Sequence, residues 1–475
     1  MTAGEYIRSR VATLKPPMDS ALNPIKAMRM LNKEQWNFFG CAWSGWIMDA
    51  FDFFTVSLTL PLLAAEFRKK DSDITWGITL TLMFRPLGAF IFGYLSDRFG
   101  RRWPFIVNNL MFIVLELGTG FCRTYNEFLI CRAFFGVAMG GIYGNSVSTA
   151  LEDCPHPSRG IMSGLFQSGY PLGYVLATAM SRALVGTTEH GWRPLFWFSA
   201  CPPVFIIVWR LMLPETRAFR ERELVSKSST GAAISFRDKA WIALRDHWLT
   251  IVYMVFLMSG FSFISHGAQD LYPTMLTEEF EFGADQLAVT QVVANIGGFL
   301  GAICVGNLSE IFGRRLAIIT SCIVAASVLY PYTTVKTPAV TAAAFFLQFA
   351  TQGAFGVLPS HLMELSPADI RSIVVGTAYQ LGTLASSGSA TIQSEVGENY
   401  FPLPPGRSGG KRYDYGLVIC VFLGAAIALV VITTFLGPEH KGRQFGLDVD
   451  EAIEGTKEAG SGSKPKSEFV EAESV

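Results

Sequence analysis

The stretch Gly93-Tyr94-Leu95-Ser96-Asp97-Arg98-Phe99-Gly100-Arg101-Arg102 occurs twice in this chain in nearly the same form. The second copy, Gly306-Asn307-Leu308-Ser309-Glu310-Ile311-Phe312-Gly313-Arg314-Arg315, lies 213 residues later. Each copy ends a long apolar stretch and follows a Leu-Gly-Ala triplet. A repeat of this period in a hydrophobic chain is typical of two similar membrane halves joined in tandem, which is the plan of many secondary transporters.

The composition indicates a membrane protein rather than a soluble one. Of the 475 residues, 50% are hydrophobic and 16% are charged, and the mean hydropathy is +0.34. A soluble chain would carry about 25% charged residues. Long stretches with few charges alternate with short arginine-rich clusters, as in a chain that crosses a bilayer many times. The net charge of −1 indicates nothing about partners.

The sequence contains no motif that indicates an enzyme, a cofactor or a metal. The Gly-rich segments have the small-residue spacing of close helix contacts, and no strand precedes them, so they are not nucleotide-binding loops. The eight cysteines occur singly, without the spacing of metal ligands or of a disulfide framework. We therefore expect no enzymatic activity, no cofactor, no metal site and no nucleic-acid partner.

Twelve apolar stretches are long enough to cross a bilayer as helices, and a charged segment separates the sixth from the seventh. The sequence therefore predicts an all-α membrane protein with two six-helix bundles. The predicted spans are 36–62, 74–95, 103–121, 127–149, 161–183, 193–213, 247–273, 287–307, 316–334, 338–361, 373–395 and 415–437. The predicted organisation is an N-terminal tail 1–34, a first bundle 35–216, a linker 217–246, a second bundle 247–437 and a C-terminal tail 438–475.

The positions of Lys and Arg predict the orientation of these spans. Arginines follow the second, fourth, eighth and tenth spans, and the central linker is rich in them. Because positive charge is retained on the cytoplasmic side, these loops and both termini are predicted to be cytoplasmic. The first 34 residues lack the continuous apolar region of a cleavable signal peptide.

Several motifs together resemble those of the major facilitator superfamily. The repeated loop motif matches its cytoplasmic signature, and Ile130–Gly140 resembles its motif in the fourth span. Pro214–Arg217 and Pro438–Arg443 look like the signatures that follow its sixth and twelfth spans. The resemblance implies the major facilitator fold with a central cavity. In the loop motif, a glycine permits close helix approach, and Asp97 can accept from a helix N-terminus or pair with an arginine. The residues assigned to this conformational motif are Gly93, Asp97, Arg98, Gly100, Arg101, Arg102, Gly306, Glu310, Gly313, Arg314 and Arg315.

A narrower resemblance lies in the seventh span, where Ser262–Thr274 looks like the signature of fungal carboxylate/proton symporters of the Jen type. Ser265, His266, Gln269, Asp270 and Thr274 match that signature. Ser262, Ala268 and, in the eleventh span, Thr383 depart from it, which leaves the cargo open. The resemblance implies proton-coupled symport of short carboxylates such as lactate, pyruvate or acetate, in the plasma membrane of a fungus.

Ionisable side chains inside a span cost about 2.5–3.5 kcal/mol to insert, so each one is a candidate for function. Asp49 and Asp52 share a helix face, and two close carboxylates suit reversible protonation. Arg85 interrupts an apolar stretch, and the repeat places Gly298 opposite it, so this charge is not part of the shared scaffold. A guanidinium matches a carboxylate, which makes Arg85 the candidate anion anchor. The alternative is an internal pair with Asp49 or Asp52.

A second polar group lies in the seventh span. His266 and Asp270 are four residues apart, so their side chains can meet and carry a proton, with Gln269 beside them. A packed histidine or an external gate at Asp270 is the alternative. Arg132 serves either proton coupling or a helix–helix pair. The predicted substrate contacts are Arg85, Asn145, His266, Gln269, Gln380 and Thr383, and the predicted proton-coupling residues are Asp49, Asp52, Arg132, His266 and Asp270.

These expectations define the function to be tested. The chain is expected to carry a small organic acid together with H+ across a lipid bilayer, as a monomer. Another organic acid, namely an aromatic acid, sialic acid or a dicarboxylate, is the main alternative. The paired aspartates also resemble those of aromatic-acid symporters, and the wider relatives of the family include sialic-acid carriers. A uniporter without proton coupling and a nutrient receptor with a transporter fold remain further alternatives.

Overall fold

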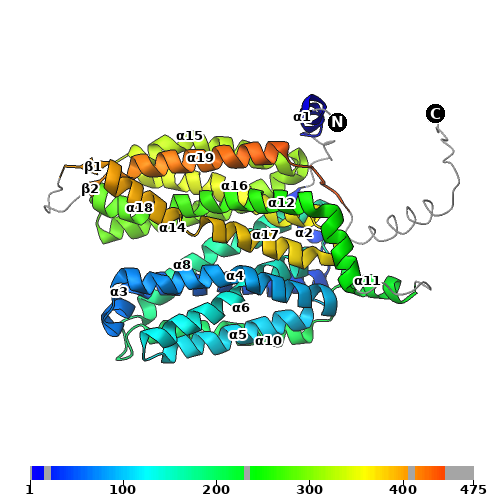
Figure 1. Ribbon diagram of the computed structural model, residues 1–475, viewed down its shortest axis with the longest axis horizontal. Helices are drawn as coiled ribbons and strands as arrows, with labels where there is room; N and C mark the ends of the chain where they lie inside the picture. Colours follow the sequence, from blue (N-terminus) through cyan, green and yellow to red (C-terminus); the bar gives the residue numbers. More distant parts are fainter. Residues whose placement is uncertain (1–2, 15–22, 229–235, 405–411, 444–475) are drawn as a thin grey trace.

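The structure is a computed structural model, and it describes residues 3–14, 23–228, 236–404 and 412–443. Two groups of helices lie side by side with their long axes roughly parallel (Figure 1). The first group comes from the N-terminal half of the chain, drawn blue to cyan, and the second from the C-terminal half, drawn green to orange. This arrangement is the one that the repeat predicts.

The first half contains six membrane spans, the last two of which consist of two helices each. Two short helices, α1 (Ala3–Ala12) and α2 (Pro24–Arg29), precede them. The spans are α3 (Lys33–Phe67), α4 (Asp71–Phe99), α5 (Arg102–Phe121), α6 (Tyr125–Leu151), α7 (Arg159–Gln167) with α8 (Gly169–Leu184), and α9 (Arg193–Ser199) with α10 (Cys201–Met212); the 3-10 turn η1 (His156–Ser158) leads into α7.

The second half repeats this plan after the helix α11 (Arg217–Ser228). Its spans are α12 (Phe236–Gln269), α14 (Ala284–Phe312), α15 (Arg314–Thr334), α16 (Val340–Leu365), α17 (Arg371–Ser386) with α18 (Ser389–Tyr400), and α19 (Tyr415–Leu436). The connections contain α13 (Tyr272–Thr274), the π-helical turn η2 (Met275–Glu279), the 3-10 turn η3 (Ala368–Ile370) and a two-stranded hairpin of β1 (Pro402–Leu403) and β2 (Arg412–Tyr413).

Ten helical stretches of the described residues are long and apolar enough to cross a membrane. The other two predicted spans, 161–183 and 373–395, are broken in the middle. The first break precedes Gly169 and Pro171, and the second lies at Ser387 and Gly388. Glycine and proline weaken a helix, so the two parts of each span are too short to qualify singly. With them, the chain has the twelve spans of the predicted fold.

The helix of the seventh span begins before the predicted span 247–273. This helix, α12, starts at Phe236, inside the segment predicted as a linker, and continues for 34 residues. No glycine or proline occurs between Phe236 and Ser259, so nothing stops the helix at the membrane surface. We propose that the linker ends where α12 begins, at Phe236. Most of the predicted C-terminal tail, from residue 444 onward, lies outside the described residues.

The two copies of the repeated motif lie at the same end of the molecule, which we call the arginine end. There α4 and α14 each stop at a glycine, Gly100 with φ of 95° and Gly313 with φ of 89°. A side chain at such a backbone angle is strained, which explains glycine at both places. The opposite end of the molecule, where the β1–β2 hairpin lies, is the far end (Figure 1).

Candidate functional site

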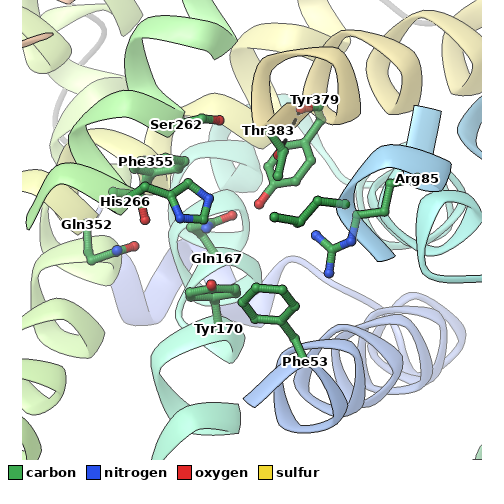
Figure 2. A pocket seen from close by; sticks show the side chains of 12 residues that line it. Phe53, Arg85, Gln167, Tyr170, Ser262, His266, Gln352, Phe355, Tyr379 and Thr383 are labelled. Carbon is green, nitrogen blue, oxygen red and sulfur yellow. Dashed lines mark hydrogen bonds between the residues drawn. The ribbon is translucent and has the colours of Figure 1, made fainter. Parts of the chain in front are cut away.

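A cavity lies between the two halves of the molecule (Figure 2). It contains about 430 Å³ of empty space, part of which is open to the surroundings. Helices of both halves contribute its walls, so a ligand held there touches both halves. The lining residues of the first half are Phe53, Leu82, Arg85, Gln167 and Tyr170, and those of the second half are Ser262, Ser265, His266, Gln352, Phe355, Tyr379 and Thr383.

Arg85 is the cation that the first half brings to the cavity. It lies on α4, which packs so closely on α6 that a Cβ on Gly140 would collide with the Arg85 carbonyl oxygen. The guanidinium Nη2 lies 3.9 Å from the Asp49 carboxylate and 3.1 Å from the Met139 sulfur, and the group stacks 5.1 Å from the Phe53 ring. Its Nε has no hydrogen-bond partner among the described residues. Because the ion pair with Asp49 is long, Arg85 retains donors for an anionic ligand.

His266 occupies the opposite wall of the cavity, on α12 of the second half (Figure 2). Its Nδ1 lies 2.9 Å from the Asp270 carboxylate, one turn farther along the helix. The His266 side chain is 13% exposed and that of Asp270 36% exposed. Since Nδ1 is engaged by the carboxylate, Nε2 is the nitrogen left for a ligand in the cavity.

Aromatic side chains form much of the remaining wall. Tyr379 of the second half stacks on Tyr143 of the first, with ring centroids 3.8 Å apart, and contacts Trp46 edge-on at 5.8 Å. Tyr170 lies across the cavity and also contacts the Trp46 ring, at 6.0 Å. Through Tyr379 these rings connect the wall of the cavity in the second half with Tyr143 and Trp46 of the first half. They could not be singled out beforehand, because aromatic residues are common throughout the apolar spans.

A second group of charges lies inside the first half, where Asp52, Glu116 and Arg132 are all buried. Arg132 Nη2 donates to Glu116 Oε1 at 2.9 Å and to the Thr119 hydroxyl at 2.7 Å. Asp52 is an electrostatic neighbour of Glu116, Arg132 and Asp49, and the Ser199 hydroxyl lies beside it. Sequence reasoning missed Glu116, although a charged residue within the predicted span 103–121 was a sufficient signal.

The arginine end is closed by two similar contacts between the halves. Asp97 on α4 accepts hydrogen bonds from the backbone N–H groups of Ser372, at 3.2 Å, and Ile373, at 2.9 Å, at the start of α17. Its counterpart Glu310 on α14 accepts from the N–H of Gly160, at 2.5 Å, at the start of α7. The positive end of each helix dipole therefore faces a carboxylate of the other half. We call these contacts the Asp97 seam and the Glu310 seam.

Buried ion pairs hold both carboxylates in place. Arg101 lies 2.5 Å from Asp97 and 2.8 Å from Glu152, and Arg314 lies 2.7 Å from Glu310 and 3.0 Å from Glu364. Glu152, at the end of α6, was not singled out from the sequence. Burial alone would raise the pKa of Glu152, but Arg101, Arg222 and Arg371 outweigh burial and lower it to about 2.

The other arginines of the motif play smaller parts. Arg98 is exposed and donates to the Tyr94 hydroxyl at 2.7 Å. The backbone N–H of Arg102 donates to Glu215 at 3.1 Å, and that of Arg315 donates to Glu439 at 2.9 Å. Gly93 and Gly306 lie where the halves touch, because a Cβ on either would come within 2.7 Å of a backbone atom of the other half.

Three predicted substrate contacts lie outside the lining of the cavity. Asn145 accepts from the Ser96 hydroxyl at 3.2 Å, between α6 and α4, and Gln269 donates to Gln348 at 3.3 Å, between α12 and α16. Gln380 is fully buried, one residue after Tyr379, and this step turns it about 100° away from the cavity. In this arrangement the Asn145 and Gln269 side chains make contacts between helices. Of the six predicted contacts, Arg85, His266 and Thr383 line the cavity.

The predicted proton-coupling residues fall into two groups. Asp49 and Asp52 lie beside Arg85 and Arg132 in the first half, and His266 and Asp270 form a pair in the second. Arg132, on α6, makes a buried ion pair with Glu116 on α5. Among the described residues, no group of three or more His, Cys, Asp or Glu side chains is placed to hold a metal ion.

Comparisons with known proteins agree with this architecture. The family model for sugar (and other) transporters matches residues 33–448. The chain is 37% identical over 444 residues to a carboxylic acid transporter protein homolog of Saccharomyces cerevisiae, covering 90% of this chain and 72% of that protein. It is 27% identical over 355 residues to a probable 4-methylmuconolactone transporter of Cupriavidus pinatubonensis, covering 74% of this chain and 81% of that protein. The solved structure of the proton:xylose symporter XylE superposes with a TM-score of 0.71 at 17% identity, over 88% of this chain and 99% of that one.

Proposed function

Since this chain belongs to the sugar (and other) transporter family, we propose that it carries a small carboxylate together with a proton across the plasma membrane. It is a multi-pass membrane protein of the major facilitator fold, and its relatives are named for the transport of carboxylic, muconic and sialic acids. Those names support an organic acid as the cargo. The proposed class is the short monocarboxylates, such as lactate, pyruvate and acetate.

Arg85 carries this proposal. It is a buried guanidinium that faces the cavity, its ion pair with Asp49 is long at 3.9 Å, and its Nε is unpartnered among the described residues. A carboxylate can accept two parallel hydrogen bonds from such a group. His266, on the opposite wall, then donates to the hydroxyl of lactate or the keto oxygen of pyruvate, with the Thr383 and Ser262 hydroxyls nearby.

The charges of the first half support coupling to a proton. Asp49, Asp52 and Glu116 are three buried carboxylates, against which lie two guanidiniums, Arg85 and Arg132. If all five ionise, the group carries one uncompensated negative charge, which is costly in a low-dielectric interior. One proton shared among the carboxylates removes that cost. A cargo anion on Arg85 adds another negative charge, and entry of another proton restores neutrality.

The two seams provide the gate of the proposed transport cycle. The arginine end, which we propose to be cytoplasmic, is closed by the Asp97 and Glu310 contacts. Cargo and proton enter from the far end while these contacts hold. Once the charges in the cavity are balanced, the halves rock, the seams separate and the cargo leaves at the arginine end. The roles of the pair His266–Asp270 and of the first-half carboxylates in proton coupling are part of this proposal.

The aromatic walls favour a second candidate cargo. Tyr170, Tyr379, Phe53 and Phe355 surround the space between Arg85 and His266 (Figure 2). Planar unsaturated acids stack well on such rings. A muconate-like acid therefore fits the same anchor, and a muconate transport protein of Acinetobacter baylyi is among the relatives, at 25% identity.

Uptake by proteoliposomes tests the proposal. Labelled lactate is supplied with and without an inward proton gradient to the wild type, Arg85→Ala, Arg85→Lys and Arg182→Ala, the last an exposed arginine on α8 that serves as control. We expect gradient-stimulated uptake by the wild type and the control, uptake about a hundredfold slower by Arg85→Ala, and a smaller loss by Arg85→Lys. Uptake that ignores the gradient would make the protein a uniporter. A wild type that takes up muconate and not lactate would establish the second cargo.

A further inference from the structure

A groove separate from the cavity runs along the outer surface where the two halves meet. Its walls come from α4 of the first half and from α12 and α17 of the second, which lie next to one another in Figure 1. It holds about 1290 Å³ of empty space, part of it open to the surroundings. Its walls include Tyr94, Arg237, Asp238, Trp241, Ile373 and Thr377.

The groove faces the region that the bilayer occupies. Phe90 and Trp241 in its walls are 56% and 69% exposed, as expected for a phenylalanine that faces lipid and a tryptophan at the membrane interface. Along α12 it extends from Arg237 to Val255, which is about 27 Å at ~1.5 Å per residue. A leaflet of the hydrocarbon core is about 15 Å thick. The groove therefore reaches from headgroup depth at the arginine end to the middle of the membrane.

The mouth of the groove is positively charged. Arg98 is exposed beside it and is bonded to the Tyr94 hydroxyl of its wall at 2.7 Å. The Arg237 side chain is 90% exposed, and its Nε lies 4.0 Å from the carboxylate of the next residue, Asp238. Two arginines against one carboxylate leave net positive charge at the depth where lipid phosphates lie. We propose that this groove binds an anionic phospholipid, with its phosphate at Arg98 and Arg237 and one acyl chain along the apolar wall.

Thr377 adds a polar feature that a bare hydrocarbon chain would not need. This residue lines the groove, and its hydroxyl is buried without a hydrogen-bond partner among the described residues. A buried donor without an acceptor costs free energy, and a bound molecule that supplies the acceptor recovers it. The ester carbonyl of a phospholipid, which lies between headgroup and acyl chain, is such an acceptor.

The groove is also part of the Asp97 seam. Ile373 lines the groove, its N–H donates to Asp97 at 2.9 Å, and its Cα would lie 2.7 Å from a Cβ on Gly93. The wall therefore exists only while α4 lies against α17. A ligand shifts an equilibrium toward the state that it binds better, so the phospholipid stabilises the arrangement that is closed at the arginine end.

Native mass spectrometry of the full chain tests the binding without reference to transport. The detergent-solubilised protein is titrated with phosphatidylserine and, separately, with phosphatidylcholine. We expect the wild type to retain phosphatidylserine in preference, and the double variant Arg98→Ala/Arg237→Ala to bind it about thirtyfold more weakly, as two arginine–anion contacts require. The control Arg123→Ala/Arg182→Ala removes two exposed arginines elsewhere on the molecule. Equal retention by wild type and double variant, or equal retention of both lipids, overturns the proposal.

Hydrogen exchange tests the effect on the seam. In nanodiscs that contain phosphatidylserine, the amides of residues 370–378 should exchange more slowly than in nanodiscs of phosphatidylcholine alone. The difference should disappear in the double variant and persist in the control. Exchange that is the same in both lipids would refute the link between the groove and the closed state, whatever the cargo proves to be.

Discussion

The substitution Asp97→Asn should open the arginine end. The Asp97 carboxylate accepts two backbone N–H groups across the seam, from Ser372 and Ile373. A hydrogen bond to a charged group contributes about 1.5–3 kcal/mol and a neutral one about 0.5–1.5 kcal/mol, so the loss is about 1 kcal/mol per bond. The closed state then loses about 2 kcal/mol, and the ratio of open to closed protein rises about thirtyfold.

The opening is best measured at the other seam. Gly160 donates its N–H to Glu310, and Asp97→Asn does not touch this bond. If the halves move as rigid bodies, hydrogen exchange at Gly160 rises by the same factor of about thirty. The matched change Glu310→Gln weakens one bond, so it should speed exchange at Ile373 only about fivefold. Unchanged exchange at Gly160 in Asp97→Asn would mean that the seams open independently, and the rigid-body reasoning would fail.

Other substitutions test other parts of the structure. Arg85→Ala should lower kcat/KM for the carboxylate about a hundredfold, as loss of a bidentate charged contact implies, and Arg85→Lys less, in initial-rate uptake. Glu116→Gln leaves Arg132 without its buried partner and should destabilise the fold by about 3 kcal/mol, seen as a lower Tm, with no change if the pair is dispensable. Gly100→Ala should cost about 1–2 kcal/mol, because φ is 95° and the new Cβ would meet Glu215; an unaltered Tm would contradict this. The pKa of Glu152 is lowered from 4.5 to about 2, so its ion pairs add about 3 kcal/mol to the free energy of unfolding. This contribution is fully present above pH 4.5 and is lost as the pH falls toward 2. Glu152→Gln should therefore abolish that part of the dependence of Tm on pH.

The fold could be predicted from the sequence because its signals are long and repeated. Apolar stretches of about 20 residues and two copies of one motif leave few arrangements of a membrane chain. The breaks before Gly169 and at Gly388 and the early start of α12 were missed. The length of an apolar stretch shows where a span lies. Where the helix breaks inside that span, or continues beyond it, depends on glycine, proline and the packing of neighbouring helices.

The site could be predicted only in part. Charged residues such as Arg85 and His266 are conspicuous inside an apolar span, because burying them is costly. Tyr170 and Tyr379 were missed because an aromatic residue has the same composition signal whether it faces lipid or a cavity. Gln380 is equally hard to place from the sequence. Its neighbour Tyr379 lines the cavity, but adjacent residues of a helix point about 100° apart, so Gln380 is directed away from it.

When the two halves of the chain are aligned by their repeat, Arg85 corresponds to Gly298, whereas Asp97 and Arg101 correspond to the charged residues Glu310 and Arg314. In a protein that arose by duplication, the contacts that separate and re-form must work in both copies, because each half closes on the other. The anion anchor is needed once, so the second copy was free to lose or never acquire it. A change of cargo can therefore evolve by substitutions in one half, while the gate contacts at Asp97 and Glu310 are kept in both halves.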